Sequence, residues 1–228
     1  KEGQEAIYTI TGDNIEQLRR SPQLEGFAAK GVEVLLLTDP IDEFWVSAMP
    51  RYQEKDLRSV TSAGADLGKV KAAEGADDKT AEEAPADEMA TLIAALKLAL
   101  GDKVKDVRAS ERLTESAVCL VAESGDMSMH LEKLLRAHGQ APGERPRILE
   151  VNPRHGLIKG LATRVKDGDL KQSQMVMLGL GVILLAVSLG LGMTSHDPAR
   201  FYFSYLTGYM GVLGITLTLL IPPLVNEV

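Results

Sequence analysis

The sequence predicts an α/β unit, then an α+β unit, and finally a hairpin of two transmembrane-like helices. Three observations carry this prediction. Residues 6–12 and 32–38 are rich in strand formers and are separated by a helical segment, which is the pattern of a βαβ unit. Residues 69–88 are rich in Ala, Glu and Asp and form a linker. Residues 175–193 and 201–225 contain no charged residue.

The first unit begins with a strand over residues 6–12 (AIYTITG). Asp13 and Glu16 have the spacing of a capping box and open a helix. Ser21 and Pro22 restart that helix as N-cap and first residue, and Gly31 ends it in the left-handed conformation. The continuous apolar run that follows, over residues 32–38, predicts a strand buried on both faces and parallel to the first.

A short helix over residues 40–49 follows that strand. Asp39 and Pro40 are suited to its N-cap and first position, and Asp42 and Glu43 are interpreted as charges that favour a helix start. Phe44 and Trp45 then bring two large aromatic side chains close to a strand end, where α/β proteins place binding surfaces. A strand near residues 57–61 completes the unit.

The second unit follows the linker. The pattern predicts a helix from Met89 to Leu100, strands at 103–109 and 117–122, a helix at 126–138, a strand at 148–151, and a helix opened by Asn152 and Pro153. Cys119, the only cysteine, is interpreted as a small core residue of a protein in a reducing compartment. The predicted division is 1–68, 69–88, 89–168 and 172–228.

The helix at 126–138 has an apolar stripe. Its four members share one face at helical spacing: Met127, Leu131, Leu134 and Leu135. Such a stripe is usually part of a core, but Met is also common on surfaces that bind many partners because its side chain is flexible and polarisable. Periodicity alone leaves both interpretations open.

The two uncharged segments at 175–193 and 201–225 are each long enough to cross a bilayer. Arg164, Lys166 and Lys171 precede the first, so the positive-inside tendency places both termini on the cytoplasmic side of an inner membrane. The alternative is an apolar hairpin buried inside a soluble protein.

Several function classes are disfavoured. The net charge is −7, and only Asp197, Arg200 and Glu227 are charged after residue 171, so the first 171 residues carry −6. This acidity argues against nucleic acid as a partner. No phosphate-binding glycine loop occurs, no catalytic constellation appears, and no metal site is expected because the histidines are scattered at 130, 138, 155 and 196. The chain starts at Lys1 and is interpreted as a fragment or a processed product.

Four blocks in a fixed order resemble the heat-shock protein 90 chaperones in their bacterial form. The blocks are KEGQEAIYTITGDN, SPQLEGFAAKGVEVLLLTDPIDEFW, KDVRASERLTESAVCLVAESGDMS and ILEVNPRHGLIKGLA. They cover residues 1–165, and the resemblance is not expected to extend to 172–228. It implies the end of the family's middle domain followed by its carboxy-terminal domain.

The resemblance also implies a function. In this family, unfolded client proteins contact an amphipathic helix and an aromatic region that match Met127, Leu131, Leu134 and Leu135, and Phe44 with Trp45. ATP and magnesium belong to a domain upstream of the matched region, so no cofactor and no ATPase activity are expected in this chain. The family is cytoplasmic and forms homodimers through terminal amphipathic helices, but the apolar segments stand in their place here, which counts against such dimerisation.

Three hypotheses follow. The first is a client-binding fragment of a protein-folding chaperone. The second is a membrane-anchored module that docks a partner. The third is a fusion of a chaperone fragment with an unrelated membrane-protein segment.

Overall fold

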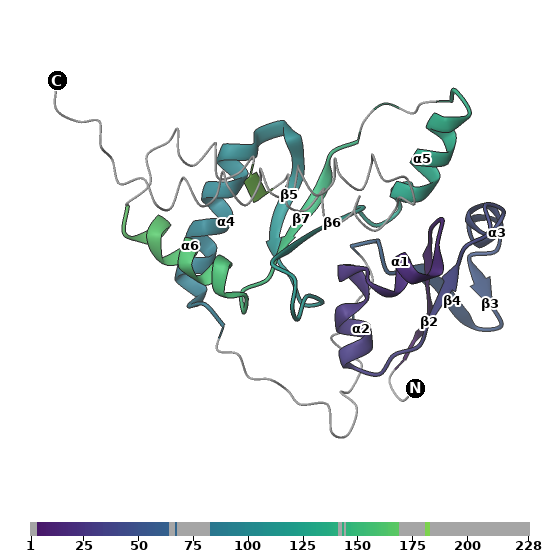
Figure 1. The fold of residues 1–228 in the computed structure, drawn as a ribbon, viewed down its shortest axis with the longest axis horizontal. Coiled ribbons are helices and arrows are strands. Elements are labelled where there is room, and N and C mark those ends of the chain that lie inside the picture. Colours follow the sequence, from purple (N-terminus) through teal and green to yellow (C-terminus); the bar gives the residue numbers. More distant parts are fainter. Residues whose placement is uncertain are drawn as a thin grey trace.

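The chain folds around two sheets, each with its own helices (Figure 1). The computed structural model describes residues 4–63, 67, 83–140, 143, 145–168 and 181–182. The first sheet has the strand order β2-β1-β4-β3 and the second has the order β5-β7-β6. The predicted succession of an α/β unit and an α+β unit is therefore present.

The first unit is a mixed sheet with short helices. Its elements are β1 (Ala6–Thr11), α1 (Ile15–Arg19), a 3-10 helix (Pro22–Leu24), α2 (Glu25–Ala29), β2 (Val34–Leu37), α3 (Asp42–Ala48), β3 (Arg51–Tyr52) and β4 (Lys55–Ser59). β1 pairs in parallel with both β2 and β4, which confirms the parallel βαβ unit, and β3 adds an antiparallel hairpin that the sequence pattern did not predict. The apolar face of this sheet packs on Phe27, whose ring meets that of Tyr8 edge-on with centroids 4.8 Å apart.

The prediction that the strand at 32–38 is buried on both faces is wrong. β2 is the edge strand of its sheet, and Leu35 is 48% exposed. Val34 and Leu36 pack against the core of the first unit, whereas Leu35 points to the opposite face of the strand. A continuous apolar run thus suits an edge strand as well as a central one.

The second unit is an α+β layer. Its elements are α4 (Ala86–Leu100), a 3-10 helix (Gly101–Lys103), β5 (Val104–Ala109), β6 (Val118–Val121), α5 (Met129–Ala137), β7 (Arg147–Val151) and α6 (Gly156–Lys166). β7 lies in the centre, parallel to β5 and antiparallel to β6. α4 and α6 lie side by side (Figure 1), and both contribute to a core that includes Leu92, Leu149 and Leu161.

Three predicted helix caps lie at other residues in the structure. Asn14, not Asp13, caps α1, because its Oδ1 accepts the N–H groups of Glu16 and Gln17. α3 begins at Asp42 after a turn, and α6 begins after His155 rather than at Asn152. In each case the polar residue that the pattern selected lies one or more residues before the cap. The predictions for Ser21 as N-cap and Gly31 in the left-handed conformation are confirmed.

The acidic linker and the apolar hairpin fall largely outside the described residues. α4 begins at Ala86, inside the predicted linker, and residues 69–82 are outside the described part. Of the apolar segments only Gly181 and Val182 are described, and Val182 is 1% exposed within the core of the second unit. In the described ranges, none of the helices combines the length and the apolar character needed to cross a membrane.

Candidate functional site

α3 presents apolar side chains to solvent at the edge of the first unit. Its entry is fixed by a turn in which Asp39 Oδ1 accepts the N–H of Ile41 at 3.1 Å and Asp42 Oδ2 accepts the N–H of Asp39 at 3.0 Å. Phe44 is 50% exposed, whereas Trp45 is half-buried and donates its indole N–H to Asp42 Oδ1 at 3.0 Å. Of the two predicted aromatic side chains, Phe44 is therefore the one that solvent reaches more freely.

α5 is an amphipathic helix without a buried residue. The predicted helix at 126–138 is shorter at its start, because Ser128 caps it, so Met127 precedes α5 and only Leu131, Leu134 and Leu135 of the predicted stripe lie on it; all four side chains are partly exposed. The helix is attached through its polar side instead: Glu132 pairs with the mostly buried Arg147 of β7, and Arg147 also donates to the carbonyl of Met127 at 2.9 Å. An apolar stripe that stays accessible while the polar side anchors the helix is unusual for a core element.

The structure brings α3 and α5 together although 80 residues of sequence separate them. Glu43 is 5% exposed, and its Oε1 accepts a hydrogen bond from Thr11 Oγ1 at 2.7 Å and another from Ser128 Oγ at 2.5 Å. Asp13 pairs with Lys133 on the second turn of α5. Figure 1 shows α5 reaching over from the second unit to lie near α1 and α3. We call Phe44, Trp45, Met127, Leu131, Leu134 and Leu135 the α3–α5 surface.

Glu43 is a residue whose role the sequence did not reveal. The interpretation as a helix-start charge fits Asp42, which closes the turn before α3, but Glu43 turns inward and joins three elements. Both acids occupy the first turn of a helix in the sequence, and only the tertiary position of Ser128 distinguishes them. No local signal could have found this contact.

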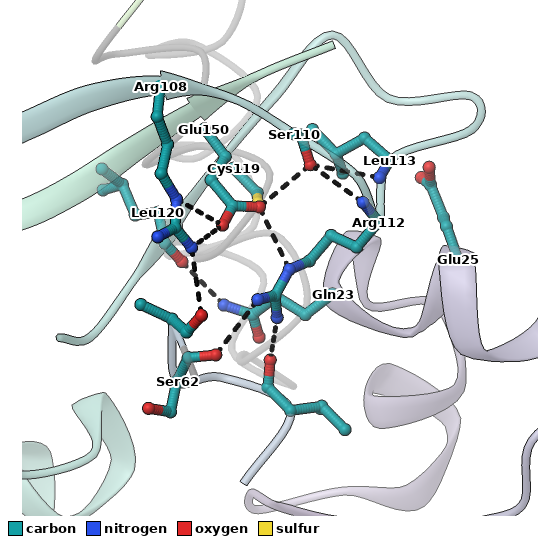
Figure 2. A network of polar contacts seen from close by, with 12 residues as sticks. Gln23, Glu25, Ser62, Arg108, Ser110, Arg112, Leu113, Cys119, Leu120 and Glu150 are labelled. Carbon is teal, nitrogen blue, oxygen red and sulfur yellow. Dashed lines mark hydrogen bonds and ion pairs between the residues drawn. The ribbon is translucent and has the colours of Figure 1, made fainter. Parts of the chain in front are cut away.

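A second contact, the seam, joins the two units below this surface. We define the seam as Arg108, Arg112, Glu150 and the segment 60–63 (Figure 2). Arg112 Nε pairs with Glu150 Oε2 at 3.0 Å, while its terminal nitrogens donate to the carbonyl oxygens of Val60 and Ser62. Arg108 Nη2 pairs with the same carboxylate at 2.5 Å, and the side chains of Arg112 and Glu150 are almost fully buried.

A backbone hydrogen bond and the carboxylate of Glu25 extend the seam. The N–H of Ala63 donates to the carbonyl of Ala122 at 2.7 Å. Glu25 of α2 accepts the N–H groups of three successive residues, 114–116, and the hydroxyl of Ser116. Gly26 lies so close to the second unit that an added Cβ would be 2.7 Å from the carbonyl oxygen of Arg112. The two units are therefore in direct contact at main-chain level.

Cys119 lies beside this network. It is 4% exposed, which confirms the prediction of a core residue, and burial raises the pKa of its thiol, an effect that the Glu150 carboxylate strengthens. A thiol held in the protonated form is a poor nucleophile. Throughout the described ranges no group of three or more His, Cys, Asp or Glu residues is arranged to hold a metal ion.

Comparison with known proteins identifies the family of this chain. The model of the Hsp90 protein family matches residues 1–204. The chain belongs to the Hsp90 protein family. It is similar to the chaperone protein HtpG of Paramagnetospirillum magneticum, with 79% identity over 205 residues that cover 88% of this chain and 32% of that relative.

Two more distant relatives give the same result. The chaperone protein HtpG of Rhodospirillum rubrum is 56% identical over 184 residues, covering 78% of this chain, and that of Roseobacter denitrificans is 47% identical over 201 residues, covering 88%. The Hsp90-family chain spans about a third of the length of these relatives, 29% and 32% for the two named here.

The family match corrects one expectation. The resemblance was expected to end at residue 165, but the family model continues to residue 204 and so includes the apolar segment 175–193. The fusion hypothesis was based on an abrupt end of the family pattern near residue 165. The family model places no end there. The comparisons and the described residues give no support to a membrane anchor.

Proposed function

We propose that this Hsp90-family chain binds non-native proteins through the α3–α5 surface. The observation that carries the proposal is the meeting of two partly exposed apolar helices from different units, joined through Glu43 and Ser128. Exposed apolar area of this kind marks binding sites in soluble proteins. The names of the HtpG relatives as chaperone proteins support the same function.

The chemistry of the surface suits clients without a fixed sequence. Burial of apolar side chains is favourable in any orientation, by about 25 cal/mol for each Å² removed from water. Met127 and the three leucines of α5 add flexible side chains that adjust to different partners. Neither property requires a nucleotide or a metal ion, and the absence of ATPase activity from this chain stays a prediction.

For the longer chaperone we propose what the family implies. It would use ATP and magnesium in other segments, form homodimers, and act in the cytoplasm. These proposals rest on membership of the Hsp90 family and on the HtpG relatives. The assignment of Phe44, Trp45, Met127 and the three leucines of α5 to client contact also stays a proposal.

Suppression of aggregation tests the proposal. The full chain is compared with a variant in which Met127, Leu131, Leu134 and Leu135 are each replaced by Gln, which keeps a good helix propensity. Leu98→Gln is the control, because Leu98 on α4 is 80% exposed but lies outside the α3–α5 surface. We expect the quadruple variant to lose most of the suppression of a heat-denatured protein and the control to retain it. Equal suppression by all three would refute the role of α5.

A further inference from the structure

The hydroxyl of Ser128 forms hydrogen bonds with both helices of the α3–α5 surface. Its Oγ accepts the N–H of Leu131 at 3.0 Å, which caps α5, and its O–H donates to Glu43 Oε1 at 2.5 Å. The first contact belongs to the second unit and the second contact reaches α3 in the first unit. The start of α5 is thus attached to the first turn of α3 by a single side chain.

We propose that Ser128 is a positioning residue, which holds α5 against α3 so that one client segment contacts both helices at once. This inference rests on the proposed function. A hydroxyl that donates to a buried carboxylate forms a stronger bond than one between neutral groups. Loss of this donor would leave the Glu43 carboxylate, which is 5% exposed, with the Thr11 hydroxyl as its other partner in the described part of the chain.

Two further contacts that the structure describes between α5 and the first unit both reach the exposed carboxylate of Asp13. Lys133 pairs with Asp13, and His130 Nδ1 lies 3.9 Å from the same carboxylate. The side chains of Lys133 and Asp13 are both more than 40% exposed, and ion pairs of this kind contribute little because water screens them. The hydrogen bond from Ser128 to Glu43 differs from these contacts because its acceptor is buried.

This geometry defines a class of client. Once an unfolded segment has bound one helix, the other helix is present at a high effective concentration. The second contact then raises the overall affinity, provided that the helices keep a fixed separation. A short apolar peptide that contacts α5 alone gains nothing from that separation. Substitution of Ser128 should therefore weaken the binding of long unfolded chains and leave the binding of short peptides unchanged.

The experiment uses the full chain and its single tryptophan. Trp45 on α3 is the fluorescence donor, and an acceptor dye on Ala137→Cys at the end of α5 reports the distance between the helices. Dye attaches selectively at position 137 because Cys119 is buried and the pKa of its thiol is raised. The long client is reduced, carboxymethylated ribonuclease A, which has no tryptophan, and the short client is an apolar tetrapeptide, whose extended length of about 14 Å is that of α5 alone.

Four substitutions separate positioning from capping. Ser128→Ala removes both contacts, Ser128→Thr restores both, and Ser47→Ala is the matched control because the Ser47 hydroxyl donates only within α3. Ser128→Asp keeps the cap but places a second carboxylate next to that of Glu43, and the two repel each other. It therefore tests the contact between positions 128 and 43 even where Ser128→Ala fails to fold. We expect Ser128→Ala and Ser128→Asp to lower energy transfer and to weaken binding of the long client about tenfold, with little change for the peptide. Ser128→Thr and Ser47→Ala should match the parent chain.

The outcomes distinguish this inference from the proposed function. Unchanged energy transfer and unchanged affinity in Ser128→Asp would refute the positioning role, as would equal losses for the long client and the peptide. If the quadruple Gln variant of α5 still binds the long client, the proposed function itself fails. If that variant loses binding while all Ser128 variants keep it, the surface stands and only the positioning role is refuted.

Discussion

The two contacts between the units differ in kind. At the seam, a buried guanidinium of Arg112 bonds to Glu150 and to backbone carbonyls of the other unit. At the α3–α5 surface, one buried carboxylate and a few exposed side chains connect the same two units, and the apolar side chains remain accessible. The difference teaches that stability and recognition are located separately. Changes at the seam should cost folding free energy, and changes at the α3–α5 surface should cost binding.

The largest effect on stability is expected from Arg112→Met. It removes the buried one of the two arginine partners of the Glu150 carboxylate and leaves the carbonyls of Val60 and Ser62 without this donor, a combination that costs about 3 kcal/mol. Urea unfolding followed by circular dichroism measures the loss. Arg58→Met, which removes an exposed pair with Asp56, should cost less than about 1 kcal/mol. Similar losses in the two variants would contradict a special role for the seam.

Gly26→Ala is expected to have the next largest effect. An added Cβ would lie 2.7 Å from the carbonyl oxygen of Arg112, so the units must move apart at a cost of about 1–3 kcal/mol. Gly160 in α6 is the matched control, because nothing lies within 4 Å of its added Cβ. Gly160→Ala should stabilise the chain by about 0.5–1 kcal/mol, as Ala usually does in a helix. Thermal unfolding of both variants tests whether Gly26→Ala lowers the stability and Gly160→Ala raises it.

The smallest effect is expected from a pair that belongs to neither contact. Lys97 Nζ lies 2.5 Å from Asp106 Oδ1, and this hydrogen bond lowers the pKa of the Asp106 carboxyl. A lowered pKa means that the stabilisation is complete above the ordinary Asp value of about 3.9 and disappears as the pH falls through the lower folded value. Asp106→Asn should therefore be slightly less stable than the parent at pH 7.

The pH dependence of that variant is the measurement. Urea midpoints of Asp106→Asn and of the parent chain should differ at pH 7 and converge as the pH is lowered well below 4. Client binding should be the same in both chains, since the pair connects α4 to β5 inside the second unit. A difference that grows toward low pH would contradict the assigned sign.

The local pattern predicted most elements of the fold. Alternation and length located β1, β5, β6 and β7, and the stripe of Met127 and the leucines located α5. The helix starts were shifted, because Asn14 and His155 took the caps predicted for Asp13 and Asn152. Neighbouring polar residues compete for a cap, and local sequence does not determine which one succeeds.

The contacts between the units were beyond the reach of sequence patterns. The inward turn of Glu43 depends on Ser128, which is 85 residues away, and the pairing of Arg112 with Glu150 depends on the connection after β5 lying against β7. The exposure of Leu35 depends on the position of β2 at a sheet edge. Each of these facts is tertiary, whereas the periodicity of a segment reports only which of its side chains share a face.

Trp45 fluorescence tests the central claim most directly. It is the only tryptophan of the chain and lies within the α3–α5 surface, so a tryptophan-free client that binds there must change its emission. We predict a shift of Trp45 emission to shorter wavelength when unfolded ribonuclease A is added to the full chain, and loss of that shift in the quadruple Gln variant of α5. Binding of the labelled client without any change at Trp45, or an undiminished shift in the variant, would contradict a surface shared by α3 and α5.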